Sequence, residues 1–155
     1  MSAPVIWTAR LILRGHAVED HPACAAMWSD PEVTRFIGGK PQSAQDAWFR
    51  ILRYAGNWAL LGYGFWAVTD HDGRFLGGGG FGDFHRGIAA LEGAPEVGWA
   101  LAPHAWGRGV ASEALAAILA WGDANLSAPE TRCLISDGNH ASVRVAERHG
   151  FAEAV

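Results

Sequence analysis

The hydrophobic pattern of this chain changes period at Gly62, and this change constrains the fold more than any other feature. Before it, apolar residues follow the i, i+3, i+4 spacing of an amphipathic helix over about 44–58, capped by Ser43. The apolar positions of that helix are Ala47, Trp48, Ile51, Leu52 and Ala55. After it, a strand at 65–69 is followed by a glycine-containing turn and a returning strand at 74–84, which predicts a hairpin. Helical and extended segments must therefore pack together.

The remaining segments alternate between strands and helices in an order that indicates the fold class. Strands are expected at 8–14, 95–101 and 131–136, and helices at 21–29, 30–36, 109–126 and 139–150. A strand, then helices, an antiparallel run and strand–helix–strand–helix predict an α/β fold with a mixed, mostly antiparallel central sheet flanked by helices. No repeat or linker interrupts the 155 residues, so we expect one domain over 1–155.

Composition excludes several classes of protein. Half of the residues are apolar and 18% are charged, which provides material for a core and argues against intrinsic disorder. A net charge of −4 argues against a nucleic-acid binder that works through a basic surface. The chain has no apolar run of ~20 residues, no signal peptide and no metal-ligand spacing among its histidines, so we expect a cytoplasmic protein without membrane or metal. Cys24 and Cys133 are expected to be free thiols in a reducing compartment.

Two glycine-rich stretches invite a ligand-binding interpretation. The run at 77–82 satisfies G-x-G-x-x-G formally, but no helix follows it, so we interpret it as a strand against which a backbone or a ligand packs closely. In the second stretch an apolar helix begins after Gly107 and Gly109, whose backbone N–H groups can point into one space, with Arg108 between them. This pattern predicts an anion site, and the alternative is an ordinary strand–helix turn.

Three motifs, in register across the chain, resemble one known family. They are Thr8-x-Arg10-Leu11-x-Leu13-Arg14, Trp106-x-x-Gly109-x-Ala111 and Asn139-x-x-Ser142-x-x-x-x-Glu147-x-x-Gly150-Phe151. Together they resemble the GNAT superfamily of acyl-CoA-dependent N-acyltransferases. The first motif and Trp106 are similar to its ribosomal-protein N-terminal acetyltransferase branch.

The resemblance implies an N-acetyltransferase that uses acetyl-CoA as its co-substrate. Such an enzyme transfers the acetyl group to a primary amine by direct attack in a ternary complex, and the acceptor is a protein N-terminus or a small amine. The alternative is a non-catalytic module of the same fold that binds acyl-CoA as a sensor or interaction partner.

The resemblance also implies where acetyl-CoA binds. In the family the fourth and fifth strands, here 95–101 and 131–136, splay apart and admit the pantetheine arm. The pyrophosphate is held by the loop before the long helix, whose cofactor-binding residues here are Trp106, Gly107, Arg108, Gly109, Val110, Ala111 and Ser112. Asn139 matches a position that reaches the cofactor arm, and it is also a candidate helix N-cap.

Two residues are candidates for the chemistry. Strand alternation places Glu96 on one face with Gly98 and Ala100, open to a substrate, so we predict that it is the general base, directly or through a water. The alternative is a glutamate that faces solvent. Many relatives carry a tyrosine acid where this chain has Ala146, and Ser142 lies one helical turn earlier. We predict that Ser142 protonates the leaving thiolate and contacts the cofactor, and the alternative is a small residue needed for packing.

The family's amine-binding groove is walled by the first helices. The corresponding residues here are Trp28, Phe36 and Trp48, and the alternative for each is a core aromatic. Relatives continue past Gly150-Phe151 with two further strands, whereas this chain stops at Val155. The sheet is therefore expected to lack its last two strands, which further residues or a partner subunit of a homodimer would supply.

Overall fold

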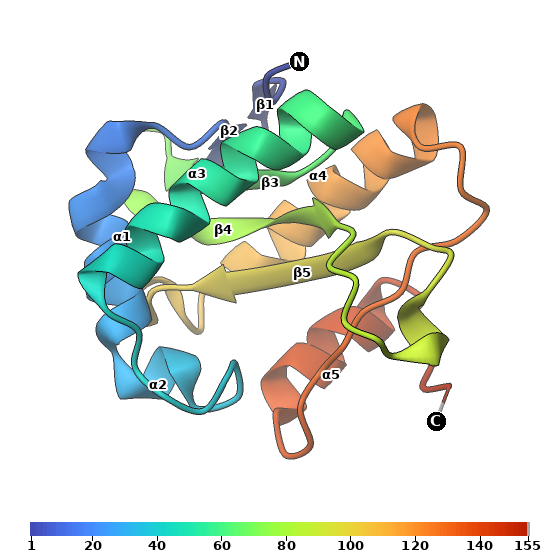
Figure 1. Cartoon of the computed structure of the whole chain (residues 1–155). Helices are drawn as coiled ribbons and strands as arrows, with labels where there is room; N and C mark the ends of the chain where they lie inside the picture. The colour runs from blue at the N-terminus through green and yellow to red at the C-terminus, as the bar shows by residue number, and fades with distance from the viewer. Residues whose placement is uncertain (155) are drawn as a thin grey trace.

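The computed structural model describes residues 1–154 and contains a five-stranded antiparallel sheet in the order β1-β2-β3-β4-β5 (Figure 1). The strands are Ile6–Trp7 (β1), Leu11–Arg14 (β2), Phe65–Asp70 (β3), Phe75–Gly82 (β4) and Glu96–Leu101 (β5). The α-helices are His21–Ser29 (α1), Pro31–Thr34 (α2), Ala44–Leu61 (α3), Val110–Asn125 (α4) and His140–Arg148 (α5). Short 3-10 turns lie at Val18–Asp20, Ala89–Leu91 and Pro103–Ala105.

Helices cover both faces of the sheet. Figure 1 shows α1 and α3 on one face, α4 on the other, and α5 beside the free edge of β5. The main core lies between the sheet and α4, where Leu115 and Ile118 are fully buried against Phe81 and Val97. A second cluster between α1, α2 and α3 includes Met27 and is separate from the first.

Strand β4 is glycine-rich because its neighbours leave no room for side chains. Gly77 to Gly80 pair with β3 on one side and β5 on the other. A Cβ on Gly79 would lie 3.0 Å from Ile118 Cδ1 of α4, and one on Gly80 would overlap the backbone of β3. The interpretation of this run as a closely packed strand is confirmed.

The strand expected at 131–136 is not formed. This segment makes one parallel bridge, between Glu96 and Arg132, and the named strands all pair antiparallel. The sheet is therefore antiparallel rather than mixed, because no described strand lies beyond this segment to hold it in a ladder. The structure also adds the short edge strand β1, which the periodicity did not predict.

The helix expected at 44–58 runs to Leu61, and its buried face differs from the prediction. Ser43 caps it, because its hydroxyl accepts a hydrogen bond from the Asp46 N–H while the Asp46 carboxylate accepts one from the Ser43 N–H. Ala47 and Ile51 are buried as expected, but Leu52 is exposed and so is Ala55. The buried positions instead continue through Tyr54 and Trp58.

Within residues 1–154, no helix is both long and apolar enough to cross a membrane. Both cysteines are free; Cys24 is buried and Cys133 is half-buried. Burial raises the pKa of Cys24 to about 12. Burial and the nearby Glu96 carboxylate raise the pKa of Cys133, so both side chains stay protonated thiols near neutral pH.

Candidate functional site

A cleft opens along the free edge of β5, because the segment after α4 leaves that strand after a single bridge. Val97 donates a backbone hydrogen bond of 2.7 Å to the Arg132 carbonyl, and the Arg132 N–H donates one of 3.0 Å to Pro95. Beyond this point the chain turns away and enters α5 (Figure 1). Alternate residues of an antiparallel strand point their backbone groups to the same side, so the N–H and C=O of Trp99 face the cleft.

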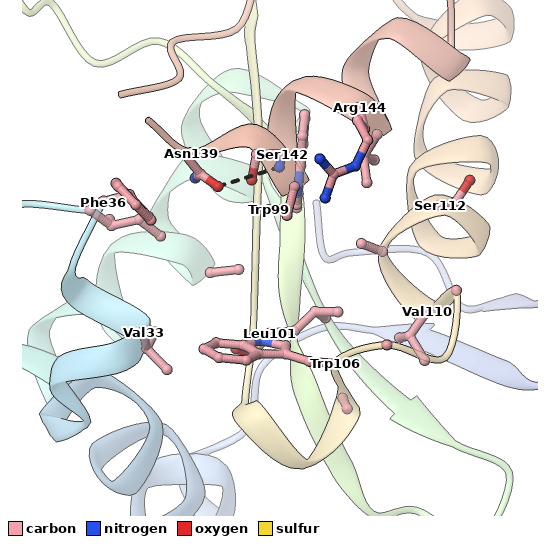
Figure 2. A pocket seen from close by; sticks show the side chains of 18 of the residues that line it. Val33, Phe36, Trp99, Leu101, Trp106, Val110, Ser112, Asn139, Ser142 and Arg144 are labelled. Atoms are coloured by element: carbon pink, nitrogen blue, oxygen red, sulfur yellow. Dashed lines mark hydrogen bonds between the residues drawn. The ribbon is translucent and has the colours of Figure 1, made fainter. Parts of the chain in front are cut away.

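A first cavity of about 500 Å³ lies in this cleft, between β5, α5 and the N-terminus of α4. Figure 2 shows its walls, with α2 on one side and α4 on the other. The labelled side chains around it include Val33, Phe36, Trp99, Leu101, Trp106, Val110, Ser112, Asn139, Ser142 and Arg144. The Trp106 indole N–H donates to the Leu101 carbonyl at 3.0 Å, which fixes the half-exposed ring against the end of β5.

The N-terminus of α4 presents its backbone N–H groups to this cavity. Gly107 and Gly109 both have φ of +73°, a left-handed conformation that glycine adopts without strain. No side chain caps the helix at Gly109, so its first-turn N–H groups remain available to a ligand. Aligned N–H groups and the helix dipole together favour an anion here, as the sequence predicts.

Arginines add positive charge to the same cavity. Arg35 of the segment after α2 and Arg144 and Arg148 of α5 line it, against one acidic residue, Glu32. Sequence reasoning missed these three, although the i, i+4 spacing of Arg144 and Arg148 places them on one helix face. The cavity therefore suits an extended ligand that carries several phosphates.

A second cavity of about 620 Å³ lies on the other side of β5, against α1 and α3. Its walls include Trp28, Arg50 and Glu96. The two cavities share the residues Phe36, Ile37, Trp99, Ala100, Asn139 and Ser142. Two ligands bound on opposite sides of β5 would thus meet beside Ser142.

Glu96 lies at the start of β5 and lines only the second cavity. It is buried, with 7% of its surface exposed, so it borders this cavity and does not face bulk solvent, which was the alternative. The guanidinium of Arg86 donates to both carboxylate oxygens, at 2.9 to 3.2 Å. Arg86 comes from the loop after β4, and nothing in the local sequence pattern indicated this pair.

Comparison with known proteins identifies the family. A family model described as an acetyltransferase (GNAT) domain matches residues 10–152. The chain belongs to the GNAT acetyltransferase family. A GnaT-family acetyltransferase from Bordetella pertussis has a similar structure, with a TM-score of 0.84 and 30% identity over 99% of this chain and 91% of that one.

Other GNAT acetyltransferases are also similar to this chain. An N-acetyltransferase of Bacillus subtilis named YoaA, described as uncharacterized, is 28% identical over 96% of this chain and 82% of its own length. The ribosomal L7/L12 α-N-protein acetyltransferase RimL, solved with coenzyme A, shares the fold with a TM-score of 0.79. It is 18% identical and covers 97% of this chain and 86% of its own. The expected family and its α/β fold are thereby confirmed, and RimL shares that fold.

The GNAT cofactor loop is only partly arranged as the motif predicts. Trp106, Gly107, Gly109, Val110, Ala111 and Ser112 all line the first cavity. Arg108 does not line it, because its side chain is exposed and its carbonyl is turned back to accept a 2.7 Å hydrogen bond from Arg10. The expectation that Arg108 adds charge to the anion site finds no support in this geometry.

The last GNAT motif places Asn139 and Ser142 where the two cavities meet. The Asn139 side-chain oxygen accepts a hydrogen bond of 3.3 Å from the Ser142 N–H, so it caps α5 as well as lining both cavities. Ser112 and His149 bond at 2.9 Å, and Ser136 donates to the Phe36 carbonyl at 2.8 Å. These contacts tie the end of α5 to α4 and the segment before α5 to the segment after α2.

The three aromatics expected in the amine groove differ in their outcomes. Phe36 lines both cavities and Trp28 lines the second one. Trp48 lines neither cavity, because it faces α1 and packs edge-on against the His21 ring at 5.3 Å. The structure therefore places two of the three at the cleft and removes Trp48 from it.

Proposed function

We propose that this protein transfers an acetyl group from acetyl-CoA to a primary amine by direct attack in a ternary complex. The observation that carries the proposal is the pair of cavities on either side of β5, which meet at Ser142. The first cavity is suited to the phosphates of a coenzyme, and the second leaves space for an acceptor. Two separate cavities would let both ligands bind at once, and transfer would then need no acetylated enzyme side chain.

Acetyl-CoA supplies a thioester whose carbonyl carbon is open to attack by an amine. In this chain the N–H groups at the start of α4 would hold the pyrophosphate, with Arg144 and Arg148 close by. The free backbone edge at Trp99 would bond the amide groups of the pantetheine arm, much as a neighbouring strand would. These residues together bind and align the cofactor along β5.

Removal of the Glu113 charge should weaken acetyl-CoA binding roughly tenfold, or about 1.4 kcal/mol, because this carboxylate holds the α4 loop in place. It accepts hydrogen bonds from Thr8 at 2.5 Å and from Arg10 at 2.7 and 2.9 Å. Partial burial acts to raise its pKa, but these bonds prevail and hold the pKa below its ordinary value. Calorimetric titration of Glu113→Gln measures the effect.

The matched control is Glu19→Gln, which removes the same charge at an exposed position that lines neither cavity. An unchanged dissociation constant for Glu113→Gln would show that the loop keeps its shape without the network.

The acceptor must lose a proton to attack, and its own pKa sets how much help it needs. A lysine-like amine with a pKa of ~10.4 is neutral in roughly one molecule in a thousand near pH 7, at a cost of about 4–5 kcal/mol. An α-amine with a pKa of ~7.7–8.0 costs only about 1 kcal/mol. Glu96 would take this proton, directly or through a water, once Arg86 shares or releases the Glu96 carboxylate.

Ser142 would protonate the departing thiolate, since its hydroxyl lies where the two cavities meet. The acceptor is a protein N-terminus or a small amine. RimL, named as an acetyltransferase of ribosomal L7/L12, supports the first of these by its fold alone. Two free thiols suit a reducing, cytoplasmic site of action.

Thiol release from acetyl-CoA over a panel of amines tests the proposal. We expect amine-dependent release, and a fall in kcat of about 10- to 100-fold for Ser142→Ala with acetyl-CoA affinity preserved. Ser127→Ala, which lies outside both cavities, is the control and should match the unaltered protein. Saturable acetyl-CoA binding without release for any amine would instead favour the sensor alternative.

A further inference from the structure

Arg50 of α3 lies in the wall of the second cavity with its guanidinium held in one orientation. Its central carbon is 3.7 Å from the centroid of the Trp28 ring, a stacked cation–π contact. One terminal nitrogen donates to the Tyr54 hydroxyl at 3.1 Å and the other to the Gln42 side-chain oxygen at 3.0 Å. All three partners are neutral, so they orient the charge without compensating it.

No carboxylate in residues 1–154 forms an ion pair with Arg50. The nearest candidate on its own helix, Asp46, bonds to the Ser43 N–H and caps α3. A guanidinium has five N–H groups, and only two of those on Arg50 have partners. Its Nε is buried and unpaired, and buried polar groups normally have partners.

A second unpaired buried atom lies in the same cavity wall. Among residues 1–154, the buried side-chain polar atoms without a partner are His16 Nδ1 and Arg50 Nε, and both residues line this cavity. The His16 ring lies tilted against the Tyr54 ring, with centroids 4.7 Å apart. Burial lowers the pKa of His16 to about 4, so it is neutral near pH 7 and offers a hydrogen bond rather than a charge.

The charged groups of the cavity wall leave a positive excess. The wall carries three arginines, Arg50, Arg53 and Arg86, against the two carboxylates of Asp83 and Glu96, and Arg86 is paired with Glu96. Arg50 and Arg53 remain without an ion-pair partner among residues 1–154. A cavity of this kind repels a second ammonium group, which argues against polyamine acceptors, and it attracts an anion.

We propose that Arg50 binds a carboxylate carried by the amine acceptor, so that the acceptor is an aminocarboxylate. This inference rests on the proposed acetyl transfer and specifies its substrate class. A stacked, pre-oriented guanidinium with free N–H groups matches the two oxygens of a carboxylate, and a neutral acceptor leaves that charge unsatisfied. The carboxylate belongs either to a free amino acid or to an acidic side chain of a peptide, and the chemistry is the same.

Matched acceptor pairs test the proposal and separate the two sources. One arm compares L-serine and L-methionine with their carboxamides, and the other compares the amidated tripeptides Ser-Asp-Ala and Ser-Asn-Ala. We expect at least a tenfold higher kcat/KM for the carboxylate member in one arm. Arg50→Gln should remove that preference mainly by raising KM, whereas Arg50→Lys should retain part of it.

Arg74→Gln is the matched control, because it removes an equal charge from an exposed arginine outside both cavities. Equal turnover of both members in both arms, with thiol release intact, would overturn this inference and leave the proposed function standing. If no amine is acetylated, the proposed function fails, and calorimetric titration of the same pairs in the presence of coenzyme A decides the inference separately. Carboxylate-selective binding that Arg50→Gln abolishes supports it, and binding without selectivity overturns it.

Discussion

Gly80→Ala should destabilise the folded protein by more than about 3 kcal/mol, a large share of the 5–15 kcal/mol that stabilises a typical domain. An added Cβ would overlap the Gly64 carbonyl oxygen and lie 2.6 Å from the Phe65 Cα. These are backbone atoms of β3 and its approach, and they cannot rotate away as a side-chain tip can. The strand ladder itself would have to shift, and urea denaturation followed by circular dichroism measures the loss.

Gly56→Ala is the control for this prediction. Gly56 lies within α3 with no atom near the position of a new Cβ, so alanine should stabilise the helix by about 0.5–1 kcal/mol. If the free energy of unfolding of Gly80→Ala lies within about 1 kcal/mol of that of the unaltered protein, the close approach of β3 and β4 is not rigid.

Glu96→Gln should lower kcat/KM by roughly 100-fold or more, the usual range for loss of a general base. Glutamine keeps the size and a hydrogen-bond acceptor but cannot take the proton of the attacking amine. The loss should be larger for a lysine-like acceptor than for an α-amine, since the former depends more on assistance. Steady-state rates for both acceptor types across pH 6 to 9 measure the effect.

The ion pair with Arg86 supplies the decisive comparison. If Glu96 is a base, Arg86→Gln frees its carboxylate and leaves most of the activity, so the two variants differ strongly. If the pair is only structural, both variants lose a similar amount of stability and a similar, small amount of activity. Equal rates for Glu96→Gln and the unaltered protein would remove Glu96 from the mechanism.

Local periodicity predicted most elements because apolar spacing reflects burial along one helix or strand. Ala47 and Ile51 of α3 and Leu11 and Leu13 of β2 are buried accordingly. The strand predicted at 131–136 was wrong, because its residues favour an extended chain but a strand also needs a neighbouring strand to pair with, and local periodicity does not show whether one is present. The prediction that Trp48 faces the amine groove was wrong for the same reason, since local spacing does not show which neighbour each face of α3 packs against.

The site residues divide in the same way, into those that local spacing predicts and those that depend on contacts between distant segments. Motif residues Asn139, Ser142 and Gly109 were found because their spacing is local. Arg86 and Arg50 were not, because one reaches its partner from a loop and the other from a helix, and only the folded chain brings them to the second cavity. Charges in pairs or on cavity walls depend on contacts between distant segments.

Strand β5 separates two cavities, and this separation affects the order in which substrates can bind as well as the chemistry. With the cofactor and the amine in separate cavities, as proposed, neither would have to leave before the other binds. A long acceptor, such as the N-terminal tail of another protein, could then enter the second cavity while the coenzyme stays bound in the first. On the proposed function, acetyl transfer would take place beside Ser142, where the two cavities meet.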